Sequence, residues 1–290
     1  MNERLAIGTV QFGLPYGIAN QTGQVTPDEA AAILEYAWNN GVNTLDTAID
    51  YGNSEQCLGD IGVKQWRISS KLPATPDDCD DISGWVEKTV YGSLDRLGIN
   101  QLHALLLHHP GQLSDARGEL VYKALNNLKD QGLIKKTGIS IYGPDELDRL
   151  WPNYTFDLVQ SPFNLIDRRL ATSGWLQLLN KKGVEIHSRS VFLQGLLLMH
   201  VSERPDRFRH WQPLWQQWQQ WQQQQSVSAV QACLAFAMSE PDIDRVIVGV
   251  DSLSQIKEII NSISSASPIP PASFANNDLE LINPSLWTLN

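Results

Sequence analysis

The sequence predicts an α/β fold of the (β/α)8 TIM-barrel type, built as a single domain over residues 1–290. Three observations indicate this fold. Short β-branched runs alternate with longer segments of helical period, which is typical of a parallel sheet. The chain has 290 residues, and one such barrel needs about 250. No internal repeat and no linker-like segment divides the sequence.

Eight short apolar runs have the length and composition of strands. Because the strands of a parallel barrel all end at one mouth, the residues that close these runs are expected to lie close together. The expected strands are Leu5–Thr9, Thr44–Thr47, Arg67–Lys71, His103–His108, Lys136–Ser140, Leu158–Gln160, Val184–Ser188 and Arg245–Val248.

Helical patterns fill most of the intervals between these runs. The first opens with Thr-Pro-Asp-Glu, which places a capping residue before a proline at the first helical position. The first three are each followed by glycine, the residue type that most readily ends a helix. The expected helices are Thr26–Asn40, Ile82–Leu97, Glu119–Gln131 and Leu253–Ser262, and another begins at Pro144.

Composition excludes several classes of protein. The net charge of −10 argues against nucleic acid or an anionic membrane as the main partner. The three cysteines, Cys57, Cys79 and Cys233, show neither metal-ligand spacing nor a disulfide framework, which favours a reducing compartment. The first residues lack the apolar core of a signal peptide, and no segment is long enough to span a membrane. We therefore expect a cytoplasmic protein.

Four residues suited to proton transfer stand at the ends of three expected strands. Asp46 closes the second run, and Tyr51 follows five residues later in the text DTAIDYGNSEQCLG. Lys71 closes RISSK and His108 closes HALLLH. Taken singly, each has an ordinary structural explanation, such as a capping carboxylate or a surface lysine. Together, at strand ends that face one mouth, they predict a catalytic group.

These motifs resemble the aldo-keto reductase family, and the resemblance extends from Leu5 to about Ile260. In that family an Asp-Tyr-Lys-His set lies at the mouth of a (β/α)8 barrel beside a nicotinamide cofactor. The resemblance implies an NAD(P)H-dependent oxidoreductase that reduces an aldehyde or ketone. A cofactor-binding regulatory or partner protein of the same fold, similar to the family's ion-channel subunits, is the alternative.

The family pattern also selects between two adjacent histidines. Its histidine is followed by one residue and then proline, which assigns the role to His108 with Pro110 matching. Adjacent residues on a strand point to opposite faces, so His109 is expected to face away from the mouth. On this argument the two are a poor metal pair, and no metal site is expected.

The resemblance implies a role for each of the four residues. A tyrosine is a poor proton donor near neutral pH unless its surroundings stabilise the phenolate, and a nearby ammonium does so. Lys71 would supply that charge and Asp46 would hold Lys71 in place. His108 would polarise the substrate carbonyl, and Tyr51 would act as the general acid during hydride transfer.

No G-x-G-x-x-G follows the first expected strand, so a Rossmann dinucleotide site is not expected. The resemblance implies the family's barrel-mouth mode instead, with a helix start near Ser252 offering N–H groups to an anion. The residues it implies for cofactor binding are Gly8, Thr9, Ser140, Gln160, Ser188, Arg189, Ser190, Leu193, Gly195, Gly249, Val250, Asp251, Ser252 and Gln255, with Asn164 in the same motif as Gln160.

Two positions depart from the family pattern. Arg189 stands where many members have an aromatic that stacks on the nicotinamide; a planar guanidinium can also stack, or the side chain can form an outward ion pair. The segment from Val250 to Gln255 lacks the Lys or Arg that many members use to hold a 2′-phosphate. NADP(H) is the cofactor that the resemblance implies, and NAD(H) is the alternative.

A tryptophan-rich segment, HWQPLWQQWQQWQQQQ, spans residues 210–225. Its tryptophans are spaced by four, three and three, so they share one helix face. We expect an amphipathic helix packed on the barrel wall, with an oligomer through Trp211–Trp221 as the alternative. The preceding loop carries Arg204, Arg207 and Arg209, which would either meet an anionic sugar derivative as substrate or be solvated.

Overall fold

The computed structural model describes residues 2–287, and its centre is a closed barrel of eight parallel strands in the order β1 to β8. The predicted fold class is confirmed, and so is each predicted strand to within one or two residues at its ends. The strands are β1 Leu5–Gly8, β2 Thr44–Asp46, β3 Arg67–Leu72, β4 Leu102–Leu107, β5 Ile134–Ser140, β6 Leu158–Pro162, β7 Glu185–Arg189 and β8 Arg245–Gly249.

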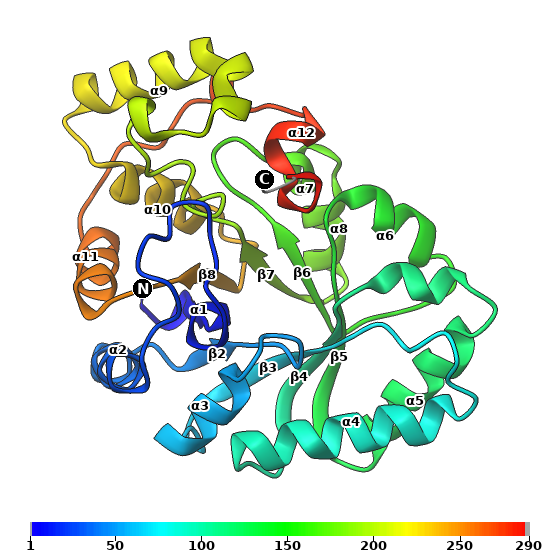
Figure 1. Cartoon of the computed structure of the whole chain (residues 1–290). Helices are drawn as coiled ribbons and strands as arrows, with labels where there is room; N and C mark the ends of the chain where they lie inside the picture. Colours follow the sequence, from blue (N-terminus) through cyan, green and yellow to red (C-terminus); the bar gives the residue numbers. More distant parts are fainter. Residues whose placement is uncertain (1, 288–290) are drawn as a thin grey trace.

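Helices surround the barrel on its outside (Figure 1). They are α1 Val10–Gly13, α2 Pro27–Asn39, α3 Ser54–Ile61, α4 Ile82–Leu97, α5 Gly118–Asp130, α6 Pro144–Leu150, α7 Arg169–Thr172, α8 Trp175–Lys181, α9 Gln212–Gln225, α10 Ala229–Ser239, α11 Leu253–Ile263 and α12 Leu279–Ile282. Short 3-10 helices cover Asn2–Arg4, Pro110–Ser114, Val201–Glu203, Asp206–Trp211, Ala272–Phe274 and Pro284–Leu286.

The predicted start of α2 and the predicted end of α4 are both formed by the expected residues. The Thr26 side chain accepts a hydrogen bond from the Glu29 N–H at the start of α2, and Gly98 ends α4 in the left-handed conformation. Apart from the one-turn helices, the helices of the described residues that were not predicted are α3, α8 and α10. Residues of α10 are buried on several sides, so its sequence lacks the one-sided apolar stripe that would have identified it.

Alternation along β3 determines which side chains enter the barrel. Ser70 points outward, where its hydroxyl donates to Glu55 on α3 at 2.7 Å. Ser69 and Lys71 therefore point inward. The register pairs Lys71 with Leu106, and Leu106 with Gly138. A Cβ on Gly138 would lie 2.5 Å from the Leu158 carbonyl oxygen, so this layer is closely packed beneath the mouth.

Helix α9 is amphipathic as predicted, but it does not pack on the barrel wall. Trp215 and Trp218 are each 1% exposed. Their indole N–H groups donate to the carbonyl oxygens of Phe208 at 2.9 Å and Leu197 at 3.0 Å. The helix thus lies on the long segment after β7 and away from the strands, as Figure 1 shows. The indoles of Trp215 and Trp218 are thus used inside the chain, and an oligomer through the Trp211–Trp221 helix stays a prediction.

Candidate active site

The buried ion pair between Lys71 and Asp46 is the centre of the site. The Lys71 Nζ lies 2.7 Å from Asp46 Oδ2, and the two side chains are 1% and 7% exposed. The same Nζ donates to the Thr47 carbonyl at 2.8 Å. Burial by itself would lower the pKa of Lys71, but Asp46 and Tyr51 outweigh it and raise that pKa. Lys71 is therefore a fixed positive charge.

Tyr51 lies directly above this charge, with its ring centroid 4.9 Å from the Lys71 Nζ. Its loop is fixed by backbone hydrogen bonds from Ile49 to Lys71 at 3.2 Å and from Tyr51 to Ala48 at 3.1 Å. Gly13, at the end of α1, allows the close approach, because a Cβ there would lie 1.8 Å from the Tyr51 carbonyl oxygen. This supporting role of Gly13 was not predicted from the sequence.

His108 is the third member of the group. Its ring meets the Tyr51 ring edge-on, with centroids 5.7 Å apart and planes at 78°. Burial, together with the positive charge of Lys71 and the neighbouring His109 and Arg189, lowers the pKa of His108 to about 3. The imidazole is thus neutral at physiological pH, and it can donate one N–H to an uncharged acceptor such as a carbonyl oxygen.

His108 and His109 both lie beyond the end of β4, although the strand was expected to continue through His108. Strand β4 ends at Leu107, one residue earlier than predicted, so the alternation of faces does not extend over His108 and His109. Their rings lie side by side, with centroids 5.2 Å apart and planes tilted by 31°. His109 does not line the cavity described below. Because the two histidines are not on a strand, strand alternation does not prevent them from binding one metal ion.

One large cavity of about 820 Å³ lies at the carboxyl ends of the strands, and its lining includes Asp46, Tyr51, Lys71 and His108. Ten of the residues predicted for cofactor binding also line it: Gly8, Thr9, Ser140, Gln160, Arg189, Ser190, Gly195, Gly249, Asp251 and Gln255. The lining includes several residues that were not predicted, among them Gln11, Tyr16 and Tyr142. Tyr142 lies in the bend after β5, beyond the reach of strand alternation.

Four predicted residues do not line the cavity. Leu193 and Val250 belong to the hydrophobic core, and Ser188 is fully buried, with its hydroxyl directed at the Arg245 carbonyl. Ser252 caps α11 by accepting from the Gln255 N–H. The start of α11 also holds a carboxylate already, because Glu29 Oε1 accepts from the Leu253 N–H at 2.6 Å.

The second polar group under the mouth links Ser140, Gln160 and Asp46. The Ser140 hydroxyl donates to Gln160 Oε1 at 3.1 Å, and Gln160 Nε2 donates to Asp46 Oδ1 at 2.6 Å. Both oxygens of Asp46 are thus engaged, one by Gln160 and one by Lys71. Asp46 thus holds Gln160 and Lys71 in place from opposite sides of the network.

Arg189 lies inside the cavity and not in an outward ion pair. Its Nη2 donates to the Ile141 carbonyl at 2.9 Å and its Nη1 to the Ser190 hydroxyl at 3.2 Å. Its guanidinium carbon lies 4.8 Å from the centroid of the Tyr142 ring. The planar cation is therefore held against an aromatic ring at the wall of the cavity.

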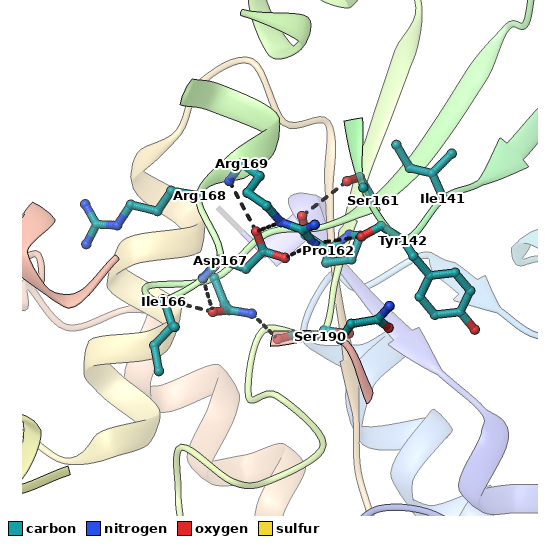
Figure 2. Close-up of polar contacts among 12 residues, drawn as sticks. Ile141, Tyr142, Ser161, Pro162, Ile166, Asp167, Arg168, Arg169 and Ser190 are labelled. Atoms are coloured by element: carbon teal, nitrogen blue, oxygen red, sulfur yellow. Dashed lines mark hydrogen bonds and ion pairs between the residues drawn. The ribbon is translucent and has the colours of Figure 1, made fainter. Parts of the chain in front are cut away.

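The loops around Arg189 are tied together by the network in Figure 2. Arg169 donates to both oxygens of Asp167, at 2.9 and 2.8 Å, and also to the Tyr142 carbonyl at 2.8 Å. Asn164 does not line the cavity; its Nδ2 donates to the Ser190 carbonyl at 3.0 Å. The ends of β5, β6 and β7 are thereby fixed relative to one another.

The three arginines of the segment after β7 contact side chains of the same segment or of α9. The Arg204 guanidinium lies 4.4 Å from the Trp215 ring centroid, and that of Arg207 lies 5.4 Å from that of Phe208. Arg209 pairs with Asp206 at 2.7 Å. None of the three lines the large cavity.

Comparison with known proteins agrees with this geometry. The Aldo/keto reductase family model matches residues 4–278. The chain belongs to the aldo-keto reductase family, and so to a family of oxidoreductases.

Among its relatives, the chain is 25% identical to a D-threo-aldose 1-dehydrogenase of Pseudomonas sp. over 93% of its own length and 94% of the relative's. It is 27% identical to an L-galactose dehydrogenase of Arabidopsis thaliana, with 91% and 86% of the two chains covered. The solved holo structure of an aldo-keto reductase from Bacillus halodurans superposes with a TM-score of 0.72 at 19% identity, covering 91% of this chain and 88% of the other.

No helix among residues 2–287 is both long enough and apolar enough to cross a membrane.

Proposed function

We propose that this protein is a nicotinamide-dependent oxidoreductase that interconverts a carbonyl group and an alcohol, with Tyr51 as the proton donor and acceptor. One observation carries the proposal: the Lys71 ammonium is buried between Asp46 and the ring of Tyr51. In this position it stabilises the negative charge that develops on the phenol oxygen when the proton leaves.

The cavity suits a dinucleotide. Its volume of about 820 Å³ is within the range of cofactor sites. Gln11 lines it with a buried Oε1 that has no hydrogen-bond partner among the described residues. Gly249 leaves the wall open, since a Cβ there would lie 2.3 Å from Gln11 Nε2. The α10 helix begins at the cavity with Ser228, Ala229 and Val230, where a helix N-terminus favours the negative charge of a pyrophosphate.

Each residue then has a part in the reaction. When bound, the nicotinamide supplies or accepts the hydride at the substrate carbon. His108 donates a hydrogen bond to the substrate oxygen and so orients the carbonyl toward Tyr51. In reduction, Tyr51 gives its proton to that oxygen; in oxidation it takes the proton from the hydroxyl.

The cofactor that we propose is NAD(H), although the sequence resemblance implied NADP(H). Around the cavity, within residues 2–287, the only Lys and Arg side chains are Lys71 and Arg189, and both lie near the catalytic group. The segment after β8 instead contributes Asp251 and Glu258. Carboxylates accept hydrogen bonds from a ribose hydroxyl but repel a 2′-phosphate.

For the substrate we propose an aldose or a related small polyol. The two relatives named above act on sugars by their names. The polar groups of the lining, such as Tyr16 and Gln194, are joined by a hydrogen bond of 2.9 Å and would face the hydroxyls of such a substrate.

Turnover is the test of the proposed function. Purified protein would be assayed with NAD⁺ and NADP⁺ on a panel of aldoses, and with both reduced cofactors on simple aldehydes. We expect cofactor-dependent oxidation or reduction that Tyr51→Phe removes. Tight dinucleotide binding with no turnover on any member of the panel would instead favour the regulatory or partner protein of the same fold.

A further inference from the structure

A second cluster of functional side chains lies at the edge of the mouth. Asp50 precedes Tyr51 in the loop after β2, and His108 and His109 follow β4. One ligand atom from each of the three side chains lies within 4.8 Å of the other two. The His108 Nδ1 atom lies 3.9 Å from Asp50 Oδ2.

One atom of this cluster has no role in the proposed reaction. His108 Nδ1 is buried and has no hydrogen-bond partner among the described residues. Its ring meets Tyr51 on one side and His109 on the other. A buried nitrogen left without a partner is unfavourable, and a ligand that accepts its lone pair would satisfy it.

Two imidazoles and one carboxylate form a donor set typical of Zn²⁺, with a fourth position left for water. Mg²⁺ and Ca²⁺ prefer oxygen ligands and are a poor match. In a tetrahedral zinc site, bonds of about 2.0–2.2 Å place ligand atoms roughly 3.4 Å apart. The ligand atoms of the cluster therefore need to approach one another only slightly, and the side chains of Asp50 and His109 are exposed.

We propose that Asp50, His108 and His109 bind Zn²⁺, or a divalent cation of similar softness, and that the bound ion inhibits the enzyme. Coordination ties His108, the proposed hydrogen-bond donor to the substrate oxygen, to Asp50 and His109. The ion and its water also narrow the entrance beside Tyr51. Residues at the other end of the cavity, such as Gly249 and Gln255, are not involved, so dinucleotide binding persists.

Calorimetric titration of the full chain with ZnCl₂ tests the binding site without any need for turnover. We expect one site in the wild type, and an affinity at least about tenfold weaker in both His109→Ala and Asp50→Asn, because each removes one of three protein ligands. Cys79→Ser and His200→Ala are matched controls, since they remove other accessible zinc-binding groups, and both should bind as the wild type does. Unchanged affinity in His109→Ala and Asp50→Asn, or loss of binding in Cys79→Ser, would overturn the site.

Inhibition is tested separately with His109→Ala, which lies outside the cavity lining and should keep the basal activity. Zn²⁺ should inhibit the wild type, and the variant should need at least about tenfold more Zn²⁺ for the same inhibition. Mg²⁺ should inhibit neither protein. Equal inhibition of both proteins by Zn²⁺, or stoichiometric binding without inhibition, would refute the inhibitory role. An enzyme without turnover would count against the proposed function, while the calorimetry would still decide on the site.

Discussion

Glu29, on α2, accepts a hydrogen bond from the backbone N–H of Leu253, the first residue of α11, at 2.6 Å. The two residues are 224 positions apart in the sequence, and their contact brings a negative charge to the one helix start that the sequence had suggested for an anion. A carboxylate there satisfies a free N–H and interacts favourably with the helix dipole. A phosphate at the same place would have to displace it.

The first prediction concerns cofactor choice. Glu29 accepts from the first N–H of α11, and Asp251 lines the cavity just before that helix. Because both carboxylates would repel a phosphate bound at this helix start, we expect NADH to bind at least about tenfold more tightly than NADPH, which corresponds to about 1.4 kcal/mol. The double variant Glu29→Gln/Asp251→Ser should narrow that ratio, mainly through tighter NADPH binding. Glu35→Gln, an exposed carboxylate on the same helix, is the control. Equal affinities in the wild type would contradict the prediction.

The second prediction assigns the proton donor. Tyr51→Phe should lower the rate of carbonyl reduction by about 10²–10⁴-fold, the usual contribution of a positioned general acid. Cofactor affinity should stay close to that of the wild type, because the ring is retained. Tyr142→Phe, which keeps the ring beneath Arg189, should cost far less. Steady-state rates with an unactivated aldehyde check this, and a Tyr51→Phe enzyme with full turnover would refute the assignment.

The third prediction concerns Lys71. Replacement by Met removes the charge beside Tyr51, so alcohol oxidation, which needs the phenolate, should require higher pH. The pH profile of oxidation is the measurement, with Lys64→Met, an exposed lysine, as the control. Since Lys71→Met leaves the buried Asp46 without its cation, the double variant Asp46→Asn/Lys71→Met provides a second test with no unpaired charge. An unchanged profile in either active variant would show that Lys71 does not tune the reaction.

The fourth prediction concerns Arg189, whose guanidinium is fixed at the cavity wall by Ile141 and Tyr142. The nicotinamide ring is positive when oxidised and neutral when reduced, and like charges repel strongly in a water-poor pocket. The wild type should therefore bind the reduced cofactor more tightly than the oxidised one. Arg189→Met should narrow that ratio, and Arg209→Gln, which is remote and exposed, should leave it unchanged. Calorimetric titration of each protein with the oxidised and the reduced cofactor measures the two affinities. If their ratio is the same in the wild type and in Arg189→Met, the guanidinium does not act on the nicotinamide ring.

The fifth prediction concerns stability in acid. Glu185, at the start of β7, contacts His103 at 3.1 Å, His187 at 2.7 Å and the ammonium of Lys136. Burial alone would raise the pKa of Glu185, but these partners outweigh it and the pKa is lowered from 4.5. A lowered folded-state pKa means that the stabilisation is present above 4.5 and is lost as the pH falls below it.

Denaturant unfolding at neutral pH and at pH values below 4.5 measures this effect. Glu185→Gln should be less stable than the wild type at neutral pH, and the difference should shrink in acid. Glu119→Gln, on the first turn of α5, is the control and should show no such convergence. If the difference in unfolding free energy between Glu185→Gln and the wild type does not depend on pH, the charge of the Glu185 carboxylate is not what stabilises the fold.

The sequence was sufficient to predict the barrel and the gathering of Asp46, Tyr51, Lys71 and His108 at one cavity, because both depend on local signals. Each strand is a short segment between helical patterns, and Asp46, Lys71 and His108 lie within one residue of the ends of β2, β3 and β4. The cofactor segment was less predictable. Leu193 and Val250 belong to matching motifs but point into the core, since a motif gives the course of a loop without the direction of each side chain.

Other features could not be predicted because they depend on contacts between distant residues. The Glu29–Leu253 hydrogen bond joins two separate helices, and the approach of Gly13 to Tyr51 depends on how α1 meets the loop after β2. The spacing of tryptophans in α9 correctly gave one buried face. It could not say that this face covers Leu197 and Phe208 and not the strands.

The placement of α9 has an evolutionary consequence. Its tryptophans hold the segment after β7, which contributes Leu198, Met199 and Glu203 to the cavity, and they contact Phe274 in the C-terminal tail. These partners all lie outside the barrel strands. Mutations in this cover can reshape the entrance while the strands next to Asp46, Lys71 and His108 keep their packing. The molecule thus separates the walls of its entrance from the floor on which we propose the chemistry, so that the entrance can diversify on its own.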